Sequence, residues 1–422
     1  MTVLAASAGG FDTAALVFGL LLMGGAVVSG LAHRSFLSLT AAFVVVGFVL
    51  GRGGLDVLHI GPESEFVRDL ATIALIVILF RDGLEVEGEM LQTAWRLPFR
   101  KLVLAMPLTA VIVALAARAL TDPRWTECFL LGALLSPTDP VLSSSVVTNP
   151  RVPRLVRHSL NLESGMNDGL ALPAVLAFTA VLVGRGPEGE QFVWWHFVLQ
   201  DVTVGLATGV VVAFLAARIM PRRHGLAEGI PEHQKSLYAL GTAFAAYGIA
   251  VVLPPAGNGL IAVFVCAITL GILRPDLRRS FETRADDIVE IVKLGVFVVF
   301  GSLLTVGGLF HDGWAAVAIV VITLLVARPV AIFVALIGTH TPPALTAFMA
   351  WFGPKGVATM TFSLLVLTSH FDGAERIFDL AALCVVASVL AHGLTDTPGS
   401  EWLARREERR EATRGGQPAP AR

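Results

Sequence analysis

The chain has 422 residues, of which 55% are hydrophobic and only 15% are charged. Soluble domains carry about 25% charged residues, so this composition excludes an ordinary soluble globule. The formal net charge of −2 gives no basic excess of the kind that binds nucleic acid.

Apolar runs long enough to cross a bilayer as a helix, which takes roughly 20 residues, recur along most of the chain. The predicted spans are residues 11–31, 36–51, 66–81, 101–119, 125–147, 158–183, 192–218, 235–253, 256–273, 284–308, 313–339, 345–369 and 376–395. We therefore predict an all-α membrane protein with about thirteen transmembrane helices. We assign residues 1–400 to one transmembrane domain and residues 401–422 to a short charged tail.

Basic residues concentrate in every second predicted loop and in the tail. The basic loops lie around Arg34, residues 96–101, residues 151–157, Arg222 and Arg278. Loops rich in Lys and Arg face the cytoplasm, so the pattern predicts an outside N-terminus and a cytoplasmic C-terminus in the inner or plasma membrane. The tail is too poor in apolar residues to form a core, and we expect it to be solvated.

The fifth predicted span is interrupted by the sequence Ser-Pro-Thr-Asp-Pro at residues 136–140. Each proline removes an amide donor and obstructs the helix, so the helix should break here. Broken backbone is tolerated inside a membrane where it lines a protein or water cavity, and its freed carbonyls can bind cations. A simple proline kink would leave Asp139 unexplained, because a carboxylate at this depth is costly. We therefore assign Asp139 and the Thr138 backbone to a candidate ion site.

The sixth span carries Glu-Ser-Gly-Met-Asn-Asp-Gly at residues 163–169. Ser164 and Asp168 are four residues apart, so a hydroxyl and a carboxylate share one face of the helix. Together with Asp139 and Thr138 they form an all-oxygen set, which suits a hard cation. The same spacing joins Glu163 to Asn167.

The buried charges divide into a structural and a functional group. Arg328, in the eleventh span, is the expected counter-charge of Glu163, and Asn167 is placed to orient that carboxylate. For Asp168 no second arginine lies within a span, and Lys355 is its only rival partner. We therefore predict a structural network at Glu163 and an ion or proton site at Asp168.

Gly-Pro-Lys-Gly at residues 353–356 interrupts the twelfth span as residues 136–140 interrupt the fifth. Two interrupted segments in opposite halves indicate inverted repeats with two crossing helices. Lys355 would then neutralise helix C-terminal dipoles at the crossing, although it could itself bind a proton.

Three further features are assigned more simply. Asp82, at the inner end of the third span, could guard an access funnel or be solvated at the interface. Glu290 and Lys293, three residues apart, predict a local ion pair. Cysteine spacing gives no metal or disulfide pattern, and we expect no cofactor.

These motifs resemble those of a known family. Residues 136–140 followed by 163–169 are similar to the Thr-Asp and Glu-Ser-x-x-Asn-Asp motifs of the electroneutral NhaP-type monovalent cation:proton antiporters, relatives of the Na⁺/H⁺ exchangers. The span count, Arg328 and the interrupted twelfth span also resemble that family, so the likeness covers nearly all of residues 10–395. One departure is that the family commonly has Gly-x-Arg-Gly where this chain has Lys355, which weakens any role that needs a guanidinium fork.

The resemblance implies a homodimer whose core domain moves against a dimerisation domain. It implies that Asp168 binds the ion and the proton, that Asp139, Ser164 and the Thr138 backbone assist, and that Glu163, Asn167 and Arg328 are structural. Asn at position 167, where some relatives have Asp, implies electroneutral exchange.

The resulting hypothesis is a secondary antiporter, not an enzyme, that exchanges Na⁺, K⁺ or Li⁺ for H⁺ by competition at Asp168. A K⁺-selective exchanger is the alternative within transporters, since oxygen ligands alone do not decide between the ions. An ion channel would conduct net current, and the sequence lacks a repeated pore-loop signature. An intramembrane aspartyl protease would also use two acidic residues, but the expected flanking signatures are absent.

Overall fold

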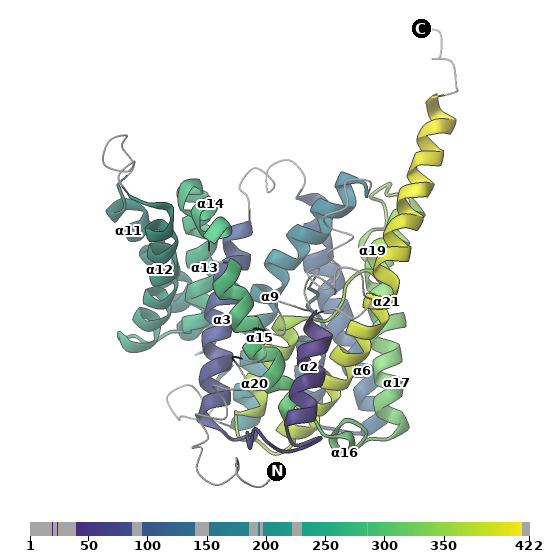
Figure 1. Ribbon diagram of the computed structural model, residues 1–422, viewed down its shortest axis with the longest axis horizontal. Coiled ribbons are helices and arrows are strands. Elements are labelled where there is room, and N and C mark those ends of the chain that lie inside the picture. Colours follow the sequence, from purple (N-terminus) through teal and green to yellow (C-terminus); the bar gives the residue numbers. More distant parts are fainter. Residues whose placement is uncertain are drawn as a thin grey trace.

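The computed structural model describes residues 19, 23, 39–86, 95–139, 152–184, 193–194, 197–221, 230–284 and 286–415. Regular structure in these residues is helical throughout, without a strand (Figure 1). The predicted first span, 11–31, falls almost wholly outside the described residues, as do Pro140 and the rest of the fifth span.

The other predicted spans correspond to helices of the structure. The helices of the N-terminal half are α2 (Leu39–Leu50), α3 (Glu65–Glu85), α5 (Arg96–Arg100) continuing through η1 (Lys101–Ala105) into α6 (Met106–Thr121), α7 (Trp125–Leu135), α9 (Arg154–Val183), and η3 (Phe197–Val202) with α11 (Thr203–Ile219). Those of the C-terminal half are α12 (Glu232–Val252), α13 (Gly259–Leu273), α14 (Pro275–Arg284), α15 (Asp286–Leu303), α16 (Val306–Leu309), α17 (Trp314–Ile322) with η4 (Thr323–Ala327) and α18 (Arg328–Ala335), α19 (Pro343–Trp351), α20 (Val357–Leu367) and α21 (Ala374–Gly415).

Six helices in the described part of the chain are long and apolar enough to cross a membrane alone. A seventh span results if α13 and α14 are counted together, although they meet at a bend of 114°. The predicted fifth and twelfth spans appear as shorter helices, because each is interrupted as the prolines and glycines indicate. The all-helical membrane fold is therefore confirmed, with interrupted helices included.

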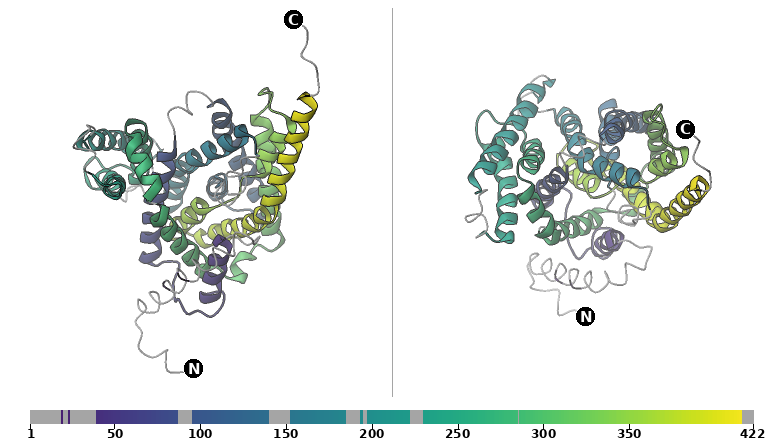
Figure 2. Two further views of the ribbon diagram at one scale, coloured as in Figure 1. Left: turned by 45° about the horizontal axis from the view of Figure 1, so that its top comes forward. Right: turned by 90° about the horizontal axis from the view of Figure 1, so that it is seen from above.

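The helices can be divided into two groups by their contacts, and Figures 1 and 2 show α11, α12, α13 and α14 together at one end of the molecule. In the first group α2 packs on α15, α3 on α13, and α11 and α12 on α13. In the second group α7 packs on α6 and α9, α18 on α19, and α20 on α21. The groups meet where α3 contacts α9 and α20, and where α15 contacts α20. The interrupted segments lie beside this boundary.

The contact between α2 and α15 depends on glycine. A Cβ atom at Gly301 of α15 would lie 3.0 Å from the backbone nitrogen of Phe48 and would overlap the carbonyl of Val44. Gly47 of α2 faces the backbone of Val298 in the same way. Small residues at such positions allow helix backbones to approach closely, which is how helices associate where water provides no driving force.

Helix α21 is longer than predicted. It continues from the membrane-spanning part through Pro398 to Gly415, and Figure 1 shows its last turns projecting beyond the other helices. Leu403 is fully buried in a cluster that includes Phe348 and Phe352. The expectation of a solvated tail from residue 401 therefore needs correction, because one apolar face packs while charged side chains such as Arg405 and Glu401 pair along the other.

Replacing Gly301 with Ala should lower the free energy of unfolding by about 1–3 kcal/mol, because the added Cβ forces α2 away from α15. Gly241→Ala is the matched control, since no atom lies within 4 Å of a Cβ at that helical position. That variant should be neutral or stabilised by up to about 1 kcal/mol through helix propensity. Thermal unfolding of both proteins in detergent checks the difference, and equal melting temperatures would contradict it.

Candidate ion-binding site

The two interrupted segments cross each other in the interior. After α7 ends at Leu135, the amide of Asp139 donates to the carbonyl of Pro354, 2.8 Å away. The amide of Val357, in the first turn of α20, donates to Oδ2 of Asp139 over 3.2 Å. A Cβ at Gly356 would collide with the Asp139 side chain, so glycine at this position permits the approach. Asp139 thus compensates the positive N-terminal end of α20.

Lys355 performs the opposite task at the same crossing. Its Nζ lies 3.1 Å from the carbonyl of Pro137 and 3.5 Å from that of Ser136, just beyond the C-terminal end of α7. A positive charge is favoured at a helix C-terminus, and these carbonyls have lost helical partners. The predicted neutralising position of Lys355 agrees with this geometry. A single ammonium reaches both oxygens, so no guanidinium fork is needed here.

Asn167 has a different partner from the one predicted. Its Nδ2 donates to the carbonyl of Thr138 over 2.6 Å and to the Thr138 hydroxyl over 3.2 Å. No hydrogen bond joins it to Glu163, although the two residues are one helical turn apart. The expectation that Asn167 orients the Glu163 carboxylate is wrong, because the broken backbone at Thr138 supplies a nearer acceptor. A carbonyl has two lone pairs, so one remains for another partner.

Asp168 is the carboxylate that the surrounding protein leaves open. Its residue is 4% exposed, and Oδ1 is buried without a hydrogen-bond partner. Ser164 lies one turn earlier on α9 and is partly exposed. Buried polar groups are nearly always paired, so a buried oxygen left unpaired needs an explanation such as an unseen ion or water.

Two residues of the first helix group face Asp168. The charges of Asp82 on α3, of Asp139 and of Lys293 on α15 act on it through space. Gly165 allows this approach, since its Cβ position lies 3.2 Å from the backbone oxygen of Asp82. Asp82 is 9% exposed, which rules out the alternative of simple interfacial solvation.

Lys293 also differs from its prediction. It is 6% exposed, whereas Glu290 is exposed, and no ion pair within 4.0 Å joins the two in the described chain. The side chains leave α15 in different directions, and Lys293 faces inward toward the charges of Asp82 and Asp168. The predicted local ion pair is therefore wrong.

Glu163 forms the centre of a buried ion-pair network. Its Oε1 lies 2.9 Å from Nη1 of Arg328, and its Oε2 lies 2.5 Å from Nζ of Lys101. Arg328 also donates from Nη2 to the carbonyls of Met349 and Phe352 at the end of α19, over 3.3 and 3.4 Å. Sequence reasoning placed Lys101 in a basic loop, yet it is 1% exposed. Its position as the first residue of an apolar run was the available signal.

The site thus contains four acidic and four basic buried side chains. They are Asp82, Asp139, Glu163 and Asp168, and Lys101, Lys293, Arg328 and Lys355. Among the described residues, no three His, Cys, Asp or Glu side chains converge closely enough to hold a metal ion. Any cation at Asp168 would therefore need backbone or hydroxyl oxygens as well as carboxylates.

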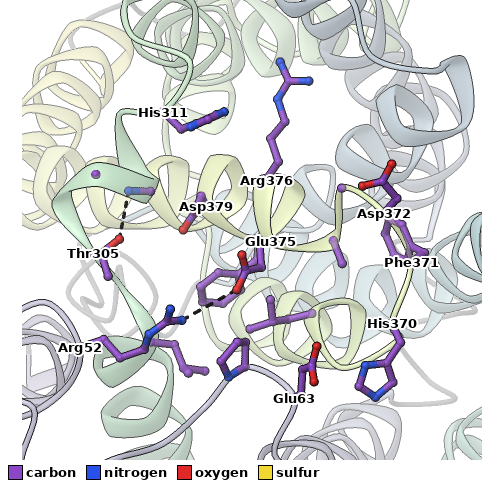
Figure 3. Close-up of a pocket in the computed structure, with 18 residues that line it drawn as sticks. Arg52, Glu63, Thr305, His311, His370, Phe371, Asp372, Glu375, Arg376 and Asp379 are labelled. Carbon is purple, nitrogen blue, oxygen red and sulfur yellow. Dashed lines mark hydrogen bonds and ion pairs between the residues drawn. The ribbon is translucent and has the colours of Figure 1, made fainter.

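A separate cavity of about 520 Å³ opens near the end of the molecule opposite the C-terminus (Figure 3). It lies between the loops that follow α2 and α15 and the start of α21, and none of the residues assigned to the ion site lines it. Arg52 and Glu375, which both line it, approach to 3.9 Å. Figure 3 shows Arg376 extending away from this pair, and its Nη2 lies 2.5 Å from Asp312. Sequence reasoning gave no indication of this cavity.

Crossed, interrupted helices with compensated ends beside an unpaired buried carboxylate define a membrane transporter of the antiporter fold. Residues 18–402 match the family described as the transmembrane sodium/hydrogen exchanger. Since this match covers most of the chain, the protein belongs to the sodium/hydrogen exchanger family.

Named relatives support this assignment. The chain is 26% identical over 398 residues to the K(+)/H(+) antiporter NhaP of Alkalimonas amylolytica, covering 92% of this chain and 66% of that protein. It is 23% identical to the K(+)/H(+) antiporter NhaP2 of Shewanella oneidensis, over 90% of this chain and 65% of that protein. It is 26% identical to the Na(+)/H(+) antiporter NhaG of Bacillus atrophaeus, over 86% of this chain and 70% of that protein. The chain spans about two thirds of the length of these relatives.

The fold is also that of a solved structure. The sodium proton antiporter MjNhaP1 from Methanocaldococcus jannaschii, determined at pH 8, matches with a TM-score of 0.77. The match covers 94% of this chain and 99% of the other at 18% sequence identity. At this identity the likeness establishes the antiporter fold.

Replacing Glu163 with Gln should lower the free energy of unfolding by about 3–5 kcal/mol, because Arg328 and Lys101 lose their shared counter-charge in the interior. Glu401→Gln is the control, since it breaks an exposed pair with Arg405 and should change stability by under about 1 kcal/mol. Thermal melting of the purified variants separates the cases, and a wild-type melting temperature for Glu163→Gln would contradict a structural role.

Proposed function

We propose that this protein is a secondary antiporter that exchanges a monovalent cation for protons at Asp168. The observation that carries the proposal is the unpaired, buried carboxylate oxygen of Asp168 beside the crossed helices. An ionisable group at such depth in a membrane protein lowers its stability. Groups of this kind are typical of ion or proton pathways.

Exchange follows from competition for one carboxylate. A proton or a cation neutralises Asp168, whereas the bare carboxylate is too costly to expose to a low dielectric during a change of access. The bare form also meets the positive charge of Lys293 on α15, in the other helix group. That attraction would hold the two groups together until Asp168 is loaded, and so would oppose movement of an empty site.

The ligands for a dehydrated cation come from backbone, hydroxyl and carboxylate oxygens. We assign as ligands the Thr138 carbonyl, which accepts from Asn167 on α9, together with Ser164 and Asp168 of the same helix. Asp139, which accepts from the amide of Val357, would assist. We add Asp82 of α3 to this set because its charge acts on Asp168, and the access role predicted for it stays a prediction. All are hard oxygen ligands, which suits Na⁺, K⁺ or Li⁺.

Access to each side would require the two helix groups to move against each other. The cavity near Arg52 and Glu375 lies where the loops of the first group meet the start of α21, so it is the natural place for an outer opening. An outside N-terminus and a cytoplasmic C-terminus, as the basic loops indicate, would put this cavity on the outer face. A homodimer in the cell membrane completes the proposal.

The identity of the cation is less constrained than the exchange itself. Relatives at nearly equal identity are named for K⁺ and for Na⁺. K⁺-selective exchange is therefore the second candidate, and the same assay distinguishes it.

Asp168→Asn should abolish exchange, since the amide can neither release a proton nor carry the charge that binds a cation. The test is a pH-jump fluorescence assay in proteoliposomes to which Na⁺, K⁺ and Li⁺ are added separately. Wild-type recovery with one or more ions, reduced at least about 100-fold in the variant, would support the proposal, and the order of ions would identify the substrate.

The matched control for this assay is Asp201→Asn. Asp201 is also a buried carboxylate, at 7% exposure, but it lies on η3 away from the crossing. It should keep at least about half of the wild-type rate. Exchange by Asp168→Asn at the wild-type rate would overturn the assignment, and recovery with no ion in the wild type would overturn antiport itself.

Wild-type exchange should be electroneutral. Position 167 is Asn, whose amide is uncharged, so Asp168 supplies the only charge of the Asn167–Asp168 pair. An imposed membrane potential of about 100 mV is worth roughly 2.3 kcal/mol per transferred charge, so an electrogenic exchanger would respond strongly. Steady-state rates measured with and without this potential should agree within about twofold. A sustained current under a cation gradient would exclude electroneutral exchange.

A further inference from the structure

The described part of α21 presents a polar stripe to the interruption between α19 and α20. Ser388, His392 and Thr395 follow one another at spacings of four and three residues, so they lie on one face of the helix. Ser388 is fully buried and His392 is 2% exposed. None of these residues belongs to the ion site or to the Glu163 network.

The stripe binds both ends of the interruption. On one side, the backbone amide of Lys355 donates to Oγ of Ser388 over 2.8 Å. On the other side, Nε2 of His392 lies 2.9 Å from the carbonyl of Trp351, the last residue of α19. Trp351 also stacks on the His392 ring and donates from its indole to Thr395 over 2.9 Å. The segment between Trp351 and Lys355 is therefore held at both ends by α21.

In a neutral His392 ring that holds Trp351, the hydrogen lies on Nε2. A carbonyl only accepts, so Nε2 of His392 must carry the hydrogen that reaches Trp351. Oγ of Ser388 accepts from Lys355, which leaves its own hydrogen for Nδ1 of His392, 3.1 Å away. A neutral ring with Nδ1 as acceptor completes one continuous chain of hydrogen bonds from Lys355 to Trp351.

The same ring has a second partner ready for a second proton. Nδ1 also lies 2.8 Å from the backbone carbonyl of Ser388, which can accept but not donate. If Nδ1 becomes protonated it can donate to this carbonyl, and the Ser388 hydroxyl can then no longer donate to the ring. One added proton therefore exchanges one hydrogen-bond pattern for another without moving the helix.

Charge adds to this change. The ionisable groups that act on His392 through space are Arg328 of α18 and Lys355 of the interruption, both positive. Glu163, the acidic partner of Arg328, is already shared between Arg328 and Lys101. A proton on His392 would thus add a third positive charge to this end of the crossing.

We propose that Ser388 and His392 form a proton-sensitive clamp that holds the interrupted helix in the geometry required for exchange and releases it in acid. His392 is a positioning residue, because it acts through the backbone of Trp351 and Lys355. The neighbouring Pro354 carbonyl accepts from Asp139, so a shift of this segment would be transmitted to the ion site. This inference concerns regulation of the site and rests on the proposed exchange.

The test separates the clamp from proton competition at Asp168. Competition raises the cation KM in acid and is overcome by saturating cation, whereas opening of the clamp lowers the maximal rate. We expect the wild-type maximal rate at saturating cation to fall at least about fivefold between about pH 8 and about pH 5.5. In His392→Gln, which can donate to Trp351 but cannot be protonated, it should change less than about twofold. The KM of both proteins should still rise in acid.

Ser388→Ala tests the other half of the clamp. It should lower the maximal rate at every pH and flatten the acid fall, because the link to Lys355 is absent throughout. Ser363→Ala is the matched control, since Ser363 is equally buried but its hydroxyl bonds only the Met360 carbonyl of its own helix. That variant should keep the wild-type profile. An unchanged acid fall of the maximal rate in His392→Gln, or no fall in the wild type, would overturn the proposal.

Tryptophan fluorescence provides a measurement that does not depend on transport. Protonated imidazole against an indole face forms a cation–π contact and quenches its emission. The emission of the wild type minus that of Trp351→Phe gives the contribution of Trp351, and this contribution should fall in acid. The fall should be absent when His392→Gln is introduced into both proteins. If the contribution of Trp351 does not change with pH, the clamp is overturned even where exchange is observed. If it falls in acid but no exchange is observed, only the proposed function is overturned.

Discussion

The structure depends on one constraint, which is that two helices stop inside the membrane and their free ends must be satisfied without water. Asp139 accepts from the amide that begins α20, and Lys355 donates to the carbonyls that follow α7. Arg328 caps the end of α19 in the same manner. Each charge is stabilised by the broken backbone, and each backbone end by the charge, so neither could persist alone at this depth.

Once these ends are satisfied, the remaining charges acquire distinct roles. Glu163 is required because Arg328 and Lys101 would otherwise be two uncompensated cations in the interior. Asp168 forms no ion pair within 4.0 Å in the described chain, and its Oδ1 is buried without a hydrogen-bond partner. The structural network thereby occupies Arg328 and Lys101, which leaves Asp168 as the candidate carboxylate for an exchangeable ion.

Much of this arrangement could be predicted from the sequence because breaks and charges inside apolar runs are conspicuous. The prolines near Thr138 and Lys355 predicted the interruptions, and Arg328 was the expected partner of Glu163. Lys101 and Lys293 were assigned wrongly because both lie near span ends, where a lysine is ordinarily solvated. The partners of Asn167 and the clamp at His392 depend on contacts between segments distant in sequence, and no local pattern reports such contacts.

The residues assigned to the ion site come from both helix groups, and in the proposed exchange this division would link occupancy to movement. Asp139 and Asp168 belong to the group that contains the crossing, whereas Asp82 and Lys293 reach them from α3 and α15. The glycine-lined contact packs α15, which carries Lys293, on α2, and α15 also contacts α3, which carries Asp82. Under the proposed exchange, relative movement of the groups would separate Asp168 from Lys293, which is costly only while Asp168 is bare. A proton or a cation bound at Asp168 would remove that cost. The attraction between Asp168 and Lys293 would therefore resist movement of the empty site only.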